Sequence, residues 1–205
     1  MYDGVFVYYN WNEPKYHFPT LAEVKDWPVL EAEGCIANGV AIINGDKFLV
    51  VATDEKQLKC ATEYYIFDGS AISDYLTAIQ DWEGKARTES FLRYAASSAT
   101  TAGPGYCYSY EKMNNTGGGI PKGQWWLPSL GELFFMYCNK KKINYALSHI
   151  SGATLLQDTS YWSSTPSGDI SEWFWGMGNG ESHRDSARYL YDFSCRPVST
   201  IYYQR

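Results

Sequence analysis

The chain has 205 residues, of which 45% are hydrophobic, 20% charged and 17% aromatic, including 8 Trp and 18 Tyr. This length suits one domain with a sizeable core, and the aromatic excess is typical of recognition surfaces. The net charge of −6 argues against a nucleic-acid partner, because binding to phosphates depends on Lys and Arg. No apolar run is long enough to span a membrane, and the first residues do not resemble a signal peptide.

The five cysteines form no C-x-x-C pair and are odd in number, so neither a disulfide framework nor a zinc site can be read from their spacing. We expect them to be small buried hydrophobic residues. We expect no metal site and no cofactor. The cysteines are Cys35, Cys60, Cys107, Cys138 and Cys195.

The first clear local pattern is a β-hairpin over residues 39–53. Two β-branched, apolar runs flank Asn44-Gly45, a dipeptide preferred in two-residue type I′ turns. Before it, residues 19–34 are expected to be helical or irregular. We therefore divide the chain into a lead-in segment, residues 1–38, and a single compact binding domain, residues 39–205.

The period then changes, because apolar residues recur every three or four positions over residues 72–82 and predict a helix. A second buried helical stripe follows, for which Thr88 is the expected cap. Residues 100–124 are rich in Gly, Pro and polar residues, and they are expected to form a long loop.

The strongest helix start in the chain is Ser129, which has the spacing of a capping box with Glu132. A short helix is expected over residues 143–150, and short strands from Leu155 to the end. Helices and strands are thus segregated along the chain, which indicates an α+β fold rather than a doubly wound parallel sheet.

Sequence signals for catalysis are weak. The glycine-rich segment around Gly123 lacks the lysine of a Walker motif, since Gln124 follows that glycine, and "GMGNG" lacks dinucleotide-binding spacing. The histidines His17, His149 and His183 form no metal-binding or catalytic pattern. We therefore expect a protein that is not an enzyme.

The segment "WFWGMGNG" has strand alternation, which places Trp173, Trp175 and Met177 on one side and Phe174 on the other. The first side is expected to pack on the helices, and the second to face solvent. The following segment, residues 181–193, mixes charged, polar and aromatic residues without clean periodicity. Such a mixture suits a recognition surface, although a surface loop without function is the plain alternative.

Several segments together resemble the bacterial C-type-lectin-like domains of gut Bacteroidales and their phages. They are "GQWWLPSLGEL" at residues 123–133, "YWSST" at residues 161–165 and "SCRPVS" at residues 194–199. Within that group, the carboxy-terminal part resembles the variable proteins of diversity-generating retroelements. The resemblance implies an α+β domain with two main helices, a small twisted antiparallel sheet and a ligand-binding face near the carboxy terminus.

In those variable proteins, the residues of the binding face are rewritten by a reverse-transcriptase-based process, while scaffold residues stay fixed. Carried over to this chain, the resemblance puts scaffold residues at Trp162, Trp173, Trp175, Met177, Arg196 and Pro197. It puts display residues, the expected ligand-binding set, at Phe174, Gly176, Gly178, Asn179, Glu181, His183, Arg184, Asp185, Arg188, Tyr189 and Tyr191.

The partner expected from this resemblance is a protein or glycan on a cell surface, met by a domain on a bacterial surface or a phage particle. The chain lacks the E-P-N or Q-P-D and W-N-D motifs of calcium-dependent lectins, so calcium-mediated sugar binding is unsupported. Two alternatives stay open. One is a modifying enzyme of the formylglycine-generating type on the same fold, and the other is a structural module of a surface or fimbrial assembly.

Overall fold

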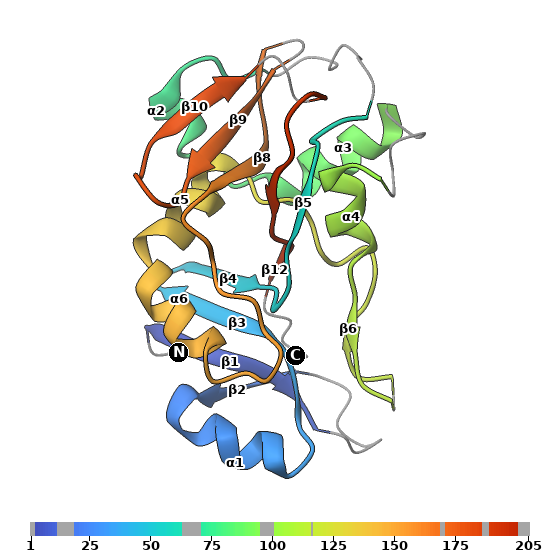
Figure 1. Ribbon diagram of the computed structural model, residues 1–205, viewed down its shortest axis with the longest axis vertical. Helices are drawn as coiled ribbons and strands as arrows, with labels where there is room; N and C mark the ends of the chain where they lie inside the picture. The colour runs from blue at the N-terminus through green and yellow to red at the C-terminus, as the bar shows by residue number, and fades with distance from the viewer. Residues whose placement is uncertain are drawn as a thin grey trace.

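The computed structural model describes residues 3–11, 19–62, 71–94, 101–115, 117–168, 171–185 and 189–200. The fold is α+β, as expected. Two five-stranded sheets follow one another along the length of the molecule, and helices flank them (Figure 1). The sheet content therefore exceeds the single small sheet that the sequence suggested. No helix in the described ranges is both long enough and apolar enough to cross a membrane.

The first sheet is antiparallel and has the strand order β12-β4-β3-β1-β2. Because β1 lies between β3 and β2, the segment expected to be a lead-in supplies two strands of this sheet. It also supplies the turn η1 (Val24–Asp26) and the helix α1 (Trp27–Ala32), which begins at a fully buried tryptophan. The strands are β1 (Gly4–Asn10), β2 (Thr20–Glu23), β3 (Ile36–Asn44), β4 (Lys47–Val51) and β12 (Val198–Ser199).

The hairpin expected over residues 39–53 is confirmed as β3 and β4, but its loop is displaced by one residue. Asn44 pairs with Lys47, so the two loop residues are Gly45 and Asp46. Gly45 has the left-handed φ of 62° that such a loop requires. Its N–H donates to Asp3 Oδ1 at 2.8 Å, which ties the loop to the residue before β1.

The second sheet has the strand order β10-β9-β8-β11-β5, and only the β8–β11 pair among them is parallel. The chain passes between the sheets twice, from β4 to β5 through residues 52–55 and from β11 to β12 through residues 196–197. The strands are β5 (Lys56–Leu58), β8 (Ser160–Gly168), β9 (Ser171–Gly176), β10 (Ser182–Asp185) and β11 (Phe193–Cys195).

The capping box of Ser129 and Glu132 is confirmed at the start of α5 (Leu130–Cys138). The next helix, α6 (Lys140–Leu147), begins three residues earlier than expected. The prediction of a helix over residues 72–82 is wrong in length, because α2 (Tyr75–Ala78) has only four residues. The backbone leaves the helix before Asp81, whose carbonyl accepts a hydrogen bond from Ser129 Oγ at 2.6 Å.

Two further expectations need correction. Thr88 does not cap a helix: it lies inside α3 (Gly84–Tyr94), and its Oγ1 exchanges hydrogen bonds with the backbone of Leu127. The loop expected over residues 100–124 contains a helix, α4 (Gly103–Ser109), and a small hairpin of β6 (Lys112–Met113) and β7 (Gly119–Ile120). Pro104 suits the first turn of α4, where no backbone N–H donor is needed.

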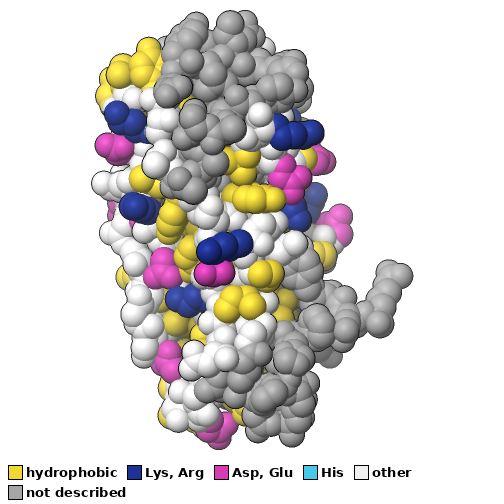
Figure 2. Space-filling view, turned by 90° about the vertical axis from the view of Figure 1, so that its right-hand side faces the viewer, with side chains coloured by type: hydrophobic (Ala, Val, Ile, Leu, Met, Phe, Trp, Pro, Cys, Tyr) yellow, Lys and Arg dark blue, Asp and Glu magenta, His cyan; other side chains and the backbone are white. Residues whose placement is uncertain are grey.

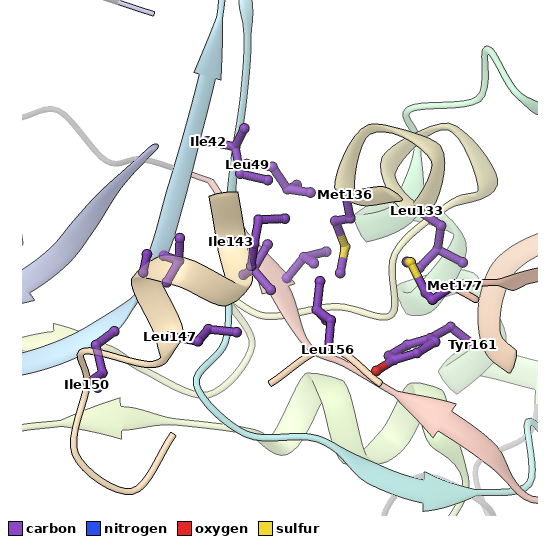
Figure 3. Close-up of a cluster of buried hydrophobic side chains, with 14 of the residues drawn as sticks. Ile42, Leu49, Leu133, Met136, Ile143, Leu147, Ile150, Leu156, Tyr161 and Met177 are labelled. Atoms are coloured by element: carbon purple, nitrogen blue, oxygen red, sulfur yellow. The ribbon is translucent and has the colours of Figure 1, made fainter. Parts of the chain in front are cut away.

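The main core is continuous between the two sheets (Figure 3). Ile42 and Leu49 of the first sheet face Ile143 of α6, and the cluster extends past Met136 of α5 to Met177 beyond β9. The helices α5 and α6 thus cover one side of both sheets. This shared core fixes the position of the second sheet, on which the predicted display residues lie.

Candidate ligand-binding face

The alternation expected along β9 is confirmed on its inner side. Trp173, Trp175 and Met177 are buried in the main core. The Trp175 ring contacts Phe134 and Tyr137 of α5, with centroids 5.4 and 5.5 Å apart. These contacts hold β9 against the helices, so they fix the backbone that carries the opposite face.

Trp173 is held in a second way, by the segment that leads into α2. Its Nε1 donates to the carbonyl oxygen of Ile72 at 2.8 Å, and its ring lies 6.2 Å from that of Tyr75. The guanidinium of Arg184, on β10, lies 5.5 Å from the Trp173 ring centroid. Arg184 therefore packs toward the inner side and does not project from the outer face.

On the outer side of the second sheet, four rings form a continuous row, which we call the aromatic row: His183, Phe174, Phe193 and Tyr191. His183 and Phe174 are register neighbours on β10 and β9, and their rings stack at 5.3 Å. Phe174 lies 4.8 Å from Phe193 of β11, which stacks on Tyr191 at 6.0 Å with an interplanar angle of 4°. His183 and Phe174 stack because the side chains of cross-strand neighbours point to the same side of a sheet.

A buried ring lies between the two central rings of the aromatic row, on the strand that separates them. Trp162 of β8 is fully buried, and its ring lies 5.8 Å from Phe174 and 4.6 Å from Phe193. The exposure of the row increases toward its two ends. Phe174 and Phe193 are half-buried, Tyr191 is 51% exposed and His183 is exposed. The outer face is therefore not wholly open to solvent, as the alternation had suggested.

The reason is that part of this side of the sheet is also covered. Cys107 of α4 packs with Trp162, Leu127 and Cys195 in a second buried cluster, and Phe174 and Phe193 border it. The outer side is thus core near α4 and surface at the rings of His183 and Tyr191. Phe193 and Trp162 were not assigned to the site from the sequence, although Tyr191, Phe193 and Cys195 alternate in the pattern of a strand.

Polar side chains line the hairpin that joins β9 and β10. Asn179 Nδ2 donates to Glu181 Oε2 at 2.8 Å, and His183 Nε2 lies 3.5 Å from the same carboxylate. Gly176 N donates to the Glu181 carbonyl oxygen, and Gly180 N donates to the Gly176 carbonyl oxygen, both at 2.8 Å. The hairpin therefore presents His183 with a neighbouring carboxylate.

The predicted display residues do not all share one surface. Gly176 is buried, and a Cβ there would lie 2.2 Å from Asn179 Oδ1. Gly178 lies at the far end of the hairpin, beside Asp158. Tyr189 is half-buried, Asp185 pairs with Glu172 along the strand, and Arg188 is outside the described residues. The structure thus brings together Phe174, His183 and Tyr191, with Asn179 and Glu181 at one end.

An open hollow of about 820 Å³ lies near the end of this hairpin. It is lined by Gly178, Met177, Asp158 and Tyr137, together with the first residues of α6. Lys140 Nζ donates to the Met177 carbonyl oxygen at 2.8 Å and contacts Asp158. The hollow therefore touches the predicted set only at Gly178, and the aromatic row lies outside it.

The surface chemistry elsewhere is mixed. On the face shown in Figure 2, basic and acidic side chains alternate with apolar ones over the middle of the molecule.

No group of three or more His, Cys, Asp or Glu side chains within the described ranges could hold a metal ion. Cys195, the cysteine nearest the carboxy terminus, is fully buried.

Comparisons with known proteins show a distant likeness of fold to a solved structure. No family model and no curated protein matches the chain. The chain is similar to the crystal structure of a fimbrial protein from Bacteroides ovatus ATCC 8483, with a TM-score of 0.51 and 16% sequence identity. The match covers 74% of this chain and 35% of that protein's chain, so the chain spans only part of the fimbrial protein's length. At this identity the likeness concerns the fold alone.

Proposed function

We propose that the chain is a non-enzymatic ligand-binding domain of a surface-exposed protein, and that it binds a cell-surface protein or glycan through the aromatic row. The observation that carries this proposal is the row itself, in which four rings extend across the sheet from β10 to β11 and become exposed at His183 and Tyr191. Aromatic faces at the surface supply contact area with little loss of side-chain entropy.

The construction of the row supports recognition rather than simple packing. Trp162, on the strand between them, contacts both central rings, and Trp173 and Trp175 hold β9 from the other side. A ligand that stacks on the row therefore meets rings that are already ordered, which lowers the entropy cost of binding. The Glu181 carboxylate beside His183 adds a hydrogen-bond acceptor for a hydroxyl or amide group.

The test is direct binding of the purified chain to a glycan array and to intact bacterial cells. The double variant His183→Ala, Tyr191→Ala should bind at least about tenfold more weakly, because it removes both exposed ends of the row. Tyr145→Ala is the matched control, since Tyr145 is a 59% exposed ring on α6. A folded double variant that binds like the unchanged chain would contradict the proposal.

We propose further that the binding face belongs to the diversified type that the sequence resemblance implies. The scaffold positions Trp162, Trp173, Trp175, Met177 and Arg196 are all buried, whereas Asn179, Glu181, His183 and Tyr191 are exposed. This division supports the proposal, because exposed side chains can change without removing core contacts. Gly176 does not fit it, since that residue is buried and closely packed.

A second candidate is a structural module of a fimbrial assembly, and the likeness to the fimbrial protein favours it. In that case the aromatic row would be covered permanently by a neighbouring subunit. Light scattering after size-exclusion chromatography separates the two. A stable oligomer that the double variant His183→Ala, Tyr191→Ala dissociates would favour the structural module, and a monomer that binds cells would favour recognition.

A further inference from the structure

Two lysines at the start of α6 are shared by two surface hollows. Lys141 and Lys142 are exposed, and both line the hollow of about 820 Å³ described above. They also line a second open hollow, of about 560 Å³, where α6 meets the start of β1 and η1. The lysine pair therefore has a hollow on either side of it.

The lysine pair is a local excess of positive charge on an acidic chain. Among the residues that the structure describes, no carboxylate forms an ion pair with Lys141 or Lys142. The two neighbouring lysines, on η1 and at the first position of α6, each have an acidic partner. The net charge of the whole chain is −6, so this pair is not part of a generally basic surface. It is complementary to an anionic group.

Both hollows offer apolar surface next to this charge. Val5, Phe6 and Val24 line the smaller hollow, and all three are half-buried. The half-buried Tyr137 and the exposed Cys138 line the larger one. The two volumes fall within the range of ligand pockets, roughly 300–1,000 Å³. Each side of the lysine pair can therefore accept an apolar group of a ligand.

We propose that the lysine pair and its two hollows, which we call the α6 groove, bind an extended acidic peptide segment of a partner protein. In this segment an acidic pair contacts the lysines, and apolar residues before and after it enter the two hollows. A small anion would leave the hollows unused, and a nucleic acid would need more cations and less apolar surface. The α6 groove is separate from the aromatic row, so this inference goes beyond the proposed function and does not depend on it.

The two kinds of contact have different roles in this binding. Exposed ion pairs add little affinity and are screened by salt. The apolar side chains therefore supply most of the binding free energy, while the lysine pair selects an acidic segment and speeds its association. Binding should weaken as the salt concentration rises, but it should not disappear.

The probes are fluorescein-labelled peptides in which a Glu-Glu pair lies between two Phe-Leu pairs, with glycine spacers of different lengths. Binding to the full chain is measured by fluorescence anisotropy. Peptides with Lys-Lys in place of Glu-Glu, or with Ser in place of Phe and Leu, should bind at least about tenfold more weakly than the best acidic peptide. Equal binding of either control would overturn the proposal, and so would no binding at any spacer length up to about 1 mM.

The double variant Lys141→Glu, Lys142→Glu reverses the charge of the α6 groove. Glutamate is favoured in the first turn of a helix, so this variant should fold with an unchanged or higher melting temperature. It should bind the acidic peptide at least about tenfold more weakly and prefer the Lys-Lys peptide. The matched control is Lys56→Glu, Lys122→Glu, which changes the net charge equally at two exposed lysines that line neither hollow. Equal loss of binding in both variants would refute the α6 groove.

Cys138 reports where the peptide binds, because it is exposed while the other four cysteines are buried, and it lines the larger hollow. Its rate of alkylation by iodoacetamide is measured by mass spectrometry, with and without saturating acidic peptide. The peptide should slow this alkylation severalfold in the unchanged chain. An unchanged rate while the peptide is bound would place the peptide elsewhere and overturn the proposal.

Discussion

Arg196 and Glu55 form a buried ion pair that joins the two segments by which the chain passes between its sheets. Arg196 Nη2 lies 2.8 Å from Glu55 Oε2, and the two side chains are 0% and 8% exposed. Arg196 Nη1 donates to the carbonyl oxygen of Ala52 at 2.9 Å, and Nη2 also donates to that of Thr154 at 2.8 Å. Tyr161 Oη donates to the same carboxylate at 2.6 Å. The pair thus belongs to a network whose hydrogen bonds compensate for its burial.

Glu55→Gln should therefore be strongly destabilising, because it leaves the Arg196 guanidinium buried without a counter-charge. We expect the free energy of unfolding to fall by about 3–5 kcal/mol, as measured by urea denaturation. The matched control is Glu23→Gln, which breaks the exposed Lys25–Glu23 pair at 2.8 Å, and which should change the free energy by less than about 1 kcal/mol. Equal effects of the two substitutions would refute this role of Arg196.

The features predicted correctly from the sequence are those that depend on nearby residues. The capping box of Ser129 and Glu132 and the alternation of Trp173 and Trp175 are confirmed, because each depends on contacts within a few residues or on the period of one strand. The segment "GPGYCYS" was expected to be loop, since its glycines disfavour a helix. It forms α4 because Cys107 is packed against the second sheet, which no local pattern reveals.

The candidate site was predicted only in part, for the same reason. The positions of Phe174 and His183 follow from one hairpin, and both were expected at the site. The contact of Phe174 with Phe193 depends on β11, which lies two strands from β9, on the other side of β8. The parallel pairing of β8 and β11 joins strands that are not consecutive in the chain. The ion pair of Glu55 and Arg196, just after β11, joins residues more than a hundred positions apart.

Gly131 should be intolerant of alanine, although alanine normally stabilises a helix by about 1 kcal/mol relative to glycine. A Cβ at Gly131, in the first turn of α5, would lie 2.4 Å from the Asp81 carbonyl oxygen and 2.8 Å from that of Ile79. Both are backbone atoms. We expect Gly131→Ala to lower the free energy of unfolding by about 1–3 kcal/mol, as for other overpacked sites.

The control for Gly131 is Gly34→Ala. Gly34 has a φ of 90° and no atom within 4 Å of the added Cβ, so this substitution strains only the local backbone. It should cost about 1 kcal/mol and leave the packing unchanged. Near-ultraviolet circular dichroism should therefore change for Gly131→Ala and stay constant for Gly34→Ala. An unchanged or increased stability of Gly131→Ala would show that α5 can shift away from Asp81.

The contribution of Glu132 to the free energy of unfolding should decrease as the pH rises from about 4.5 to about 8. Burial raises the pKa of this carboxyl group from 4.5 to about 8. The hydrogen bonds from Ser129 N and Trp126 Nε1 favour the ionised form and lower the pKa, but their effect is smaller than that of burial. Between these values the folded chain binds more protons than the unfolded chain. The contribution is complete below the unfolded pKa and is lost as the pH passes the folded pKa, with a slope of at most about 1.4 kcal/mol per pH unit.

Glu132→Gln removes this titration and keeps the size of the side chain. The measurement is the free energy of unfolding of both proteins across this pH range. The difference between the two curves isolates Glu132, because the other titrating groups are common to both. The stability of the unchanged chain should fall relative to that of the variant as the pH rises. Parallel curves would mean that Glu132 stays ionised in the folded protein.

Trp173 and Tyr191 should differ sharply in their effect on stability. Trp173→Ala removes a 5% exposed ring and its hydrogen bond to Ile72, and it should cost about 3–5 kcal/mol. Tyr191→Ala removes a half-exposed ring at the end of the aromatic row, and it should cost less than about 1 kcal/mol while weakening ligand binding. A loss of stability of the same size in both variants would place the aromatic row in the core.

The diversified-face proposal makes its own prediction about natural variation. In many copies of this gene from one natural population, substitutions should cluster at the exposed positions Asn179, Glu181, His183 and Tyr191. They should be absent at Trp173 and Arg196, because these side chains are buried and their loss would unfold the domain. A near-identical template repeat should lie beside the gene. The measurement is sequencing of the 3′ end of the gene, in which a uniform tail without such a repeat would leave a recognition face of fixed specificity.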